Sequence, residues 1–125
     1  LNPTGFISVP IRWMQLYERA MQEMNNVTNE DLRREILRKE VIGSHLHWGL
    51  SAAGYLSPEI FKFFQLNGVE LCSGFGMTEA TGGITMTPPG DYVDNSTGKA
   101  LPGVYTRLKK SGELEISGHY VARYL

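Results

Sequence analysis

The type of fold follows from residues 44–73, which read SHLHWGLSAAGYLSPEIFKFFQLNGVELCS. Residues 44–50 alternate between apolar and polar side chains, which is typical of a strand. The Ser-Pro-Glu at residues 57–59 predicts a helix start, because serine caps a helix, proline fits its first turn and an acid suits its positive end. That helix ends at an Asn-Gly pair, and residues 69–73 form a second short apolar run. A strand, a helix and a strand in about 30 residues imply a parallel strand pair with a right-handed crossover.

Two helices are expected before this unit. The first covers residues 9–24 and carries apolar side chains at spacings of three and four, which predicts a buried face formed by Met14, Tyr17, Met21 and Met24. The second covers residues 29–42. Thr28 and Asp31 resemble a capping box at its start, and Gly43 is expected to end it in a left-handed conformation.

The remaining segments are predicted to be strands and loops. Strand-like runs occur at residues 84–87, 104–109 and 113–117, with a tight turn at residues 110–112. The predicted fold class is therefore α/β, with two N-terminal helices, a parallel strand-helix-strand unit and a C-terminal antiparallel strand region. We expect a helical segment over residues 1–43, an α/β segment over residues 44–103 and a β-strand tail over residues 104–125.

Composition excludes several classes of protein. The 125 residues carry a formal net charge of -1, and 42% of them are hydrophobic, which is typical of a globular chain and unlike a disordered or collagen-like one. Without a basic stripe we expect neither nucleic acid nor an anionic membrane as partner. No apolar run reaches the roughly 18 residues of a membrane span. The single cysteine, Cys72, suits a reducing compartment, so we expect a cytoplasmic protein in which this thiol is buried and not a nucleophile.

The chemistry is expected in residues 73–79, SGFGMTE, which we interpret as a loop at the carboxyl end of the second strand, where open α/β sheets bind ligands. Its two glycines let the backbone approach a ligand closely. Phe75 offers a flat face to a planar base, Thr78 a hydroxyl to a phosphate oxygen, and Glu79 a hard oxygen ligand to Mg²⁺. The spacing matches neither the dinucleotide fingerprint nor the phosphate-binding loop. From these residues alone, a nucleotide site and an ordinary glycine-rich turn with a solvated acid are both open.

Four segments in a fixed order resemble motifs of the adenylate-forming superfamily, which includes acyl-CoA synthetases, firefly luciferase and nonribosomal adenylation domains. Residues 74–79 resemble its Tyr-Gly-x-Thr-Glu motif. The other three are residues 51–57, similar to Ser-Gly-Gly-Ala-Pro-Leu-Ser, residues 98–103, similar to Gly-x-x-x-Pro-Gly, and residues 112–118, similar to Gly-Glu-Leu-x-Val-x-Gly. Residues 9–18 are similar to the Val-Pro helix of fatty acyl members. The resemblance implies part of the large N-terminal domain of an acyl-CoA synthetase-like fold.

The resemblance also implies roles for individual residues. Phe75 takes the place of the aromatic that stacks on adenine, and Thr78 and Glu79, the candidate catalytic residues, take the places of the α-phosphate contact and the Mg²⁺ ligand. The implied nucleotide-binding set is Ala53, Gly54, Tyr55, Ser73, Gly74, Phe75, Gly76, Met77 and Thr78. Gly82 and Gly83 take the places of residues that keep the acyl channel open. The chain departs from the family in having Ala52 and Ala53 for two glycines, Tyr55 for proline and Phe75 for tyrosine.

The reaction implied by the resemblance joins a carboxylic acid, with fatty acids favoured, to ATP as an acyl-adenylate and then transfers the acyl group to CoA. The family's phosphate loop lies upstream of Leu1, and its ribose-binding aspartate and catalytic lysine lie downstream of Leu125. We therefore expect an internal fragment that is inactive alone and whose partners include the remainder of its own polypeptide. Two alternatives are a stand-alone nucleotide-binding or interaction module without turnover, and an adenylation domain that loads a carrier-protein thiol.

Overall fold

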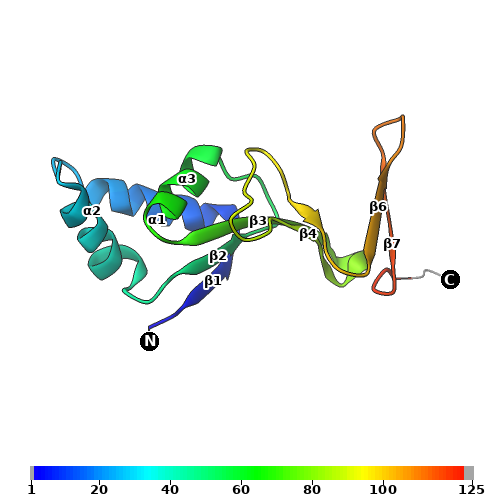
Figure 1. Cartoon of the computed structure of the whole chain (residues 1–125), viewed down its shortest axis with the longest axis horizontal. Coiled ribbons are helices and arrows are strands. Elements are labelled where there is room, and N and C mark those ends of the chain that lie inside the picture. The colour runs from blue at the N-terminus through cyan, green and yellow to red at the C-terminus, as the bar shows by residue number, and fades with distance from the viewer. Residues whose placement is uncertain (1, 123–125) are drawn as a thin grey trace. The chain divides into compact units, whose positions relative to one another are not determined.

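The computed structural model describes residues 2–122 and divides the chain into two compact units, Leu1–Cys72 and Ser73–Leu125. Helices and strands alternate in the first unit, and strands dominate the second, so the fold class is mixed α/β, as predicted (Figure 1). Residues 123–125 of the expected strand tail lie outside the described residues. Within residues 2–122, no helix has the length and apolar character needed to cross a bilayer.

The first unit contains the predicted strand-helix-strand unit and one strand more. In chain order its elements are β1 (Gly5–Ser8), α1 (Pro10–Glu23), α2 (Glu30–Ile36), the π-helical segment η1 (Leu37–Ile42), β2 (Trp48–Ser51), α3 (Pro58–Leu66) and the start of β3 (Glu70–Met77). β1 was not predicted, because four residues are too few for an alternating pattern to stand out. It pairs in parallel with β2, and β2 is followed in the sheet by β3, where the Glu70 amide donates to the His47 carbonyl over 2.9 Å.

Trp13 of α1 lies at the centre of the first unit's core. Its side chain is fully buried, with ring centroids 5.2 Å from Phe6 and 5.1 Å from Phe64 in edge-to-face contacts. Its indole N–H donates to the Leu50 carbonyl over 3.3 Å. A Cβ on Gly49 would lie only 2.4 Å from the indole Cη2, so glycine lets β2 approach this helix closely. The contact fixes α1 against β2.

The predicted methionine face of α1 is only partly correct. Met24 is buried, but Met14 and Met21 are 37% and 42% exposed. The fully buried positions of the helix are Trp13 and Ala20. The bulky, rigid indole determines which side of the helix faces the core, whereas flexible methionines tolerate partial exposure.

The helix ends also differ in detail from the sequence prediction. Asn29, and not Thr28, caps α2, and its side chain accepts from the Leu32 amide over 2.9 Å. Helix α2 then passes directly into η1. Gly43 follows with a φ of 87° and a ψ of 149°, so its φ is positive as expected, but its conformation is not the left-handed helical one. Ser57 precedes α3 as predicted, but its side chain makes no capping hydrogen bond.

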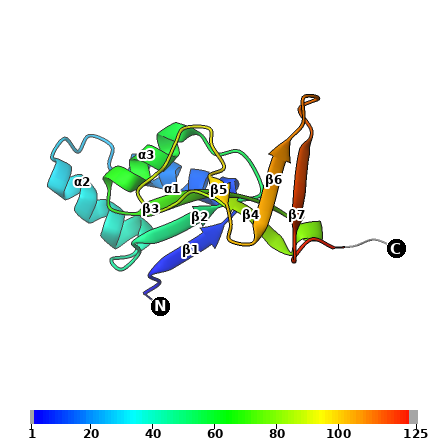
Figure 2. The ribbon, with the colours of Figure 1, turned by 45° about the vertical axis from the view of Figure 1, so that its right-hand side comes forward.

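The second unit continues β3 and adds short antiparallel strands. Its further elements are the 3-10 segment η2 (Thr78–Ala80), β4 (Gly82–Met86), β5 (Lys99–Ala100), β6 (Val104–Leu108) and β7 (Leu114–Gly118). The first sheet has the order β1-β2-β3-β4-β5, with β3–β4 and β4–β5 antiparallel. Strands β6 and β7 form a separate antiparallel hairpin, as predicted (Figure 2). Its predicted turn is present, with Gly112 at a φ of 86°.

Candidate nucleotide-binding site

The segment expected to be a binding loop is mostly strand, which corrects the sequence prediction. Ser73, Gly74, Phe75, Gly76 and Met77 all belong to β3, and only Thr78 and Glu79 lie beyond it, in η2. The glycine content suggested a loop because glycine is unfavourable in strand interiors. The structure shows a different use of glycine, namely a close approach between two backbones.

Gly76 sits directly against the backbone of β4. A Cβ built on Gly76 would lie 1.7 Å from the Gly82 carbonyl oxygen and 3.2 Å from the Gly83 Cα. The β3–β4 register shifts between Phe75 and Gly76, so a β-bulge lies within the motif. Bulges bend a strand and redirect its side chains, and they are frequent next to active sites. Gly76, Gly82 and Gly83 together therefore form a tight backbone contact at the point where the motif leaves the strand.

The side chains that could contact a ligand lie at this bulge and directly after it. Phe75 is 36% exposed, and Met77 is 41% exposed. Thr78 and Glu79 are both exposed on η2, which is closed by the Thr81 amide donating to the Thr78 carbonyl over 3.0 Å. Thr81 follows in the left-handed conformation with a φ of 52°. An aromatic face, a hydroxyl and a carboxylate are thus accessible within five consecutive residues.

Glu79 has the chemistry of a magnesium ligand. Its side chain is exposed, while its backbone carbonyl accepts from the Ala122 amide over 2.6 Å. Residues 2–122 contain no group of three or more His, Cys, Asp or Glu side chains that could hold a metal ion among themselves. Mg²⁺ takes one or two carboxylates and completes its shell with water and substrate phosphates. A single accessible carboxylate beside a candidate phosphate contact fits that ion.

The other predicted segment follows β2 in the first unit. Ala53 has a φ of 64°, a conformation that favours glycine, and Gly54 lies against Pro10, where a Cβ would come within 3.3 Å of the ring. Tyr55 is 72% exposed. Just before the loop, the Ser51 hydroxyl is buried and has no hydrogen-bond partner among the described residues. Ala53, Gly54 and Tyr55 thus belong to the first unit, whereas the remaining predicted residues from Ser73 to Gly83 belong to the second.

Cys72 and Thr87 are two buried residues next to the motif. Burial, together with the charge of Glu70, raises the pKa of the Cys72 thiol, which makes it a weaker nucleophile at neutral pH, in line with its predicted structural role.

Thr87 was missed by the sequence analysis. It is 2% exposed, and it hydrogen-bonds to Ser73 at the start of the motif. No sequence signal separates it from Thr85, which lies two positions earlier in the same alternating pattern.

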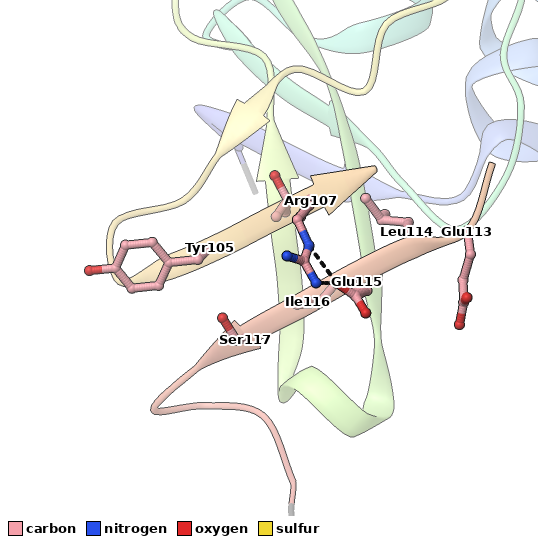
Figure 3. A pocket seen from close by; sticks show the side chains of 8 residues that line it. Tyr105, Arg107, Glu113, Leu114, Glu115, Ile116 and Ser117 are labelled. Carbon is pink, nitrogen blue, oxygen red and sulfur yellow. Dashed lines mark hydrogen bonds and ion pairs between the residues drawn. The ribbon is translucent and has the colours of Figure 1, made fainter. Parts of the chain in front are cut away.

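An open hollow on the β6–β7 hairpin is not part of the predicted site. It is lined by residues 105–107 of β6, by Glu113 of the turn and by residues 114–117 of β7 (Figure 3). Across the strands, Arg107 donates to Glu115 over 2.7 Å, and Lys109 lies 2.9 Å from both Glu113 and Glu115. Exposed pairs of this kind contribute about 0–1 kcal/mol each. We interpret this face as a solvated cross-strand charge network.

Comparison with solved structures shows which known proteins share this fold. The fold matches an anthranilate CoA ligase, AuaEII, solved with anthranoyl-AMP, at a TM-score of 0.71 and 20% identity over 98% of this chain and 23% of that one. It also matches a benzoate CoA ligase from Burkholderia xenovorans LB400, at a TM-score of 0.67 and 23% identity over 97% of this chain and 24% of that one. The chain therefore shares its fold with part of each of these two CoA ligases.

Sequence comparison then assigns the family. The profile of the AMP-binding enzyme family matches residues 1–124, and the chain belongs to that family. Long-chain-fatty-acid–CoA ligase 6 of Rattus norvegicus is 32% identical over 111 residues, which cover 82% of this chain and 16% of the relative. Long-chain-fatty-acid–CoA ligase FadD15 of Mycobacterium bovis is 25% identical over 66% of this chain and 14% of the relative. The chain thus spans about a sixth of the length of these relatives.

Proposed function

We propose that the chain is part of an ATP-dependent acyl-CoA synthetase, which activates a carboxylic acid as an acyl-adenylate and transfers the acyl group to CoA. The observation that carries the proposal is the Gly76–Gly82 backbone contact. The contact lies between Phe75 in β3 and the segment η2 that carries Thr78 and Glu79, in a chain that belongs to the AMP-binding family. These side chains supply an aromatic face, a phosphate contact and a metal ligand.

In this proposal the motif residues bind the nucleotide. The exposed ring of Phe75 stacks on adenine, and the Thr78 hydroxyl donates a hydrogen bond to an α-phosphate oxygen. Glu79 would hold Mg²⁺, which would supply positive charge beside the phosphates. The backbone at Gly74 is proposed to approach the nucleotide closely, because glycine carries no side chain. At Gly76 the corresponding space is taken by the Gly82 carbonyl. A solved relative, o-succinylbenzoate coenzyme A synthetase from Bacillus subtilis, was obtained with ATP and magnesium ion.

Two further segments are assigned to ligand contacts. Ala53, Gly54 and Tyr55 are proposed to contact adenine and the acyl group, largely through backbone atoms. Gly82 and Gly83 are proposed to leave the acyl channel unobstructed, because neither carries a side chain. At Gly83 a Cβ would already meet Leu101 at 2.8 Å, so the space beside this position is narrow.

The proposed acid substrate is a fatty acid. The named sequence relatives are long-chain-fatty-acid–CoA ligases, and one of them is 32% identical over most of this chain. The aromatic-acid ligases share the fold at 20% and 23% identity.

The test is acid-dependent ATP–pyrophosphate exchange by the full-length polypeptide that carries these residues. A panel of short, medium and long fatty acids, benzoate and anthranilate is assayed with and without CoA. We expect exchange with fatty acids and acyl-CoA formation when CoA is added. Exchange with aromatic acids alone would contradict the fatty acid assignment, and an absence of exchange with every acid would contradict the proposed reaction.

A further inference from the structure

Thr87 makes two hydrogen bonds to Ser73 at the start of the motif. Its amide donates to the Ser73 carbonyl over 2.8 Å, and its Oγ1 accepts from the Ser73 amide over 3.2 Å. In a regular antiparallel pair, a main-chain carbonyl would accept from that amide. Here a side-chain hydroxyl that is almost completely buried replaces the carbonyl. We call this arrangement the Thr87 clamp.

The clamp lies next to an irregular part of the β3–β4 pairing. The register shifts between Phe75 and Gly76. A slip by one residue would turn the following side chains to the opposite face of the sheet. The Gly76–Gly82 contact fixes the register on the far side of the bulge, and the Thr87 clamp fixes it on the near side. The orientation of Phe75 depends on both.

Residues 97–98 pack against the end of β4 and against Thr87. A Cβ on Gly98 would lie 2.0 Å from the Met86 carbonyl carbon and 2.2 Å from the Thr87 nitrogen. The neighbouring Thr85 hydroxyl donates to the Thr97 carbonyl over 2.8 Å. The end of β4 is therefore packed between Ser73 and residues 97–98, so Thr87 has little freedom to move.

We propose that Thr87 is a positioning residue, which holds Phe75 through Ser73 in the orientation needed to bind the nucleotide. This inference rests on the proposed function. The hydroxyl, and not the size of the side chain, carries the effect, because an apolar side chain of the same shape leaves the partly buried Ser73 amide without its acceptor. Thr87 is almost completely buried and acts through Phe75, the proposed adenine contact, so its loss should affect nucleotide binding more than acid binding.

The experiment compares Thr87→Val and Thr87→Ser in the full-length polypeptide, with Thr106→Val at an exposed position of β6 as the matched control. We expect Thr87→Val to raise the KM for ATP about tenfold, a size typical of losing one buried hydrogen bond, with the KM for the acid within about twofold of wild type. Thr87→Ser should restore the KM for ATP, and the control should not change it. Hydrogen exchange of residues 73–77 should be faster only in Thr87→Val.

Several results would overturn the inference. The first is a KM for ATP that is unchanged in Thr87→Val. The second is an equal rise in the KM for ATP and the KM for the acid, and the third is a KM for ATP that is as high in Thr87→Ser as in Thr87→Val. If Thr87→Val does not fold, Thr87→Cys provides the same comparison, since sulfur is a weak acceptor. If the wild type shows no ATP–pyrophosphate exchange with any acid, the proposed function fails. Unchanged hydrogen exchange in Thr87→Val would then still refute the clamp.

Discussion

The carbonyl oxygen of Gly82 occupies the place where residue 76 would carry a side chain, 1.7 Å from the ideal Cβ position. Even a methyl group at residue 76 must therefore push β3 and β4 apart. Since Phe75 precedes this contact and η2 follows it, the geometry of the candidate site depends on the absence of one carbon atom.

We expect Gly76→Ala to lower the free energy of unfolding by about 3 kcal/mol, the upper range for overpacking a close contact. Gly112→Ala is the matched control, because Gly112 has a φ of 86° but nothing within 4 Å of its Cβ position. It should lose only about 1 kcal/mol through backbone strain. Chemical denaturation of both variants measures the difference, and equal losses would show that the Gly76 contact is unimportant.

At Ala53 a substitution should raise the free energy of unfolding instead of lowering it. Its φ of 64° is unfavourable for a residue with a Cβ, so Ala53→Gly should stabilise the protein by about 0.5 kcal/mol. Ala52 is not among the residues with positive φ, and Ala52→Gly should instead destabilise by about 0.4–1 kcal/mol. Thermal unfolding of the two variants checks the signs. A loss of stability in Ala53→Gly would contradict the strained conformation.

The contact between Gly49 and Trp13 predicts a double-mutant coupling. Gly49→Ala places a methyl 2.4 Å from the indole and should destabilise by about 2–3 kcal/mol. In a Trp13→Phe background the smaller ring leaves room, so the added loss should fall by at least about 1 kcal/mol. Denaturant unfolding of the wild type, the two single variants and the double variant measures this coupling. Simple additivity would mean that Gly49 is not packed against Trp13.

The stability of the α1–α3 contact should fall at high pH. The Tyr17 hydroxyl donates to Glu59 over 2.8 Å, and this bond, burial and the charge of Glu59 raise the pKa of Tyr17 above its ordinary value of 10.0. The folded state therefore holds the proton more tightly, so the contribution is complete below pH 10 and is lost as the pH rises through the folded pKa.

The measurement is the difference in unfolding free energy between wild type and Tyr17→Phe from pH 8 to pH 11. We expect the advantage of the wild type to shrink above about pH 10. Glu59→Gln should weaken the dependence, because the carboxylate is the main cause of the raised pKa. A difference that stays constant across this range would refute the assignment.

The sequence allowed the class of fold and the motif to be predicted, but not how the motif is built. Pro58 and Glu59 in the first turn of α3 and the turn at residues 110–112 act locally, so α3 and the β6–β7 hairpin were found. The strand character of residues 73–77 comes from pairing with β4, a partner that no local pattern reveals. For the same reason Thr87 could not be recognised, since its role depends on Ser73, fourteen residues earlier.

The buried face of α1 was predicted only in part, for a related reason. Spacing alone identified a methionine stripe, but the orientation of the helix is decided by how Trp13 fits against Gly49. That fit depends on β2, which is distant in sequence. Periodicity therefore predicted the helix and part of its buried face, namely Tyr17 and Met24, but not Trp13 and Ala20.

The 125-residue chain alone should form no acyl-adenylate, because stabilising charge at the α-phosphate requires cationic groups in addition to a metal. Purified chain incubated with ATP, Mg²⁺ and a fatty acid should give no acid-dependent pyrophosphate exchange. Steady exchange by the isolated chain would contradict the view that it supplies only part of an active site.

The central claim is that Glu79 holds the magnesium ion of an adenylation site. It is tested most directly by magnesium-dependent ATP–pyrophosphate exchange in the full-length polypeptide, comparing wild type with Glu79→Ala and with Glu40→Ala, a change at another exposed acid. We predict that Glu79→Ala abolishes exchange, while Glu40→Ala leaves it at the wild-type level. Exchange that is unchanged in Glu79→Ala would contradict the account.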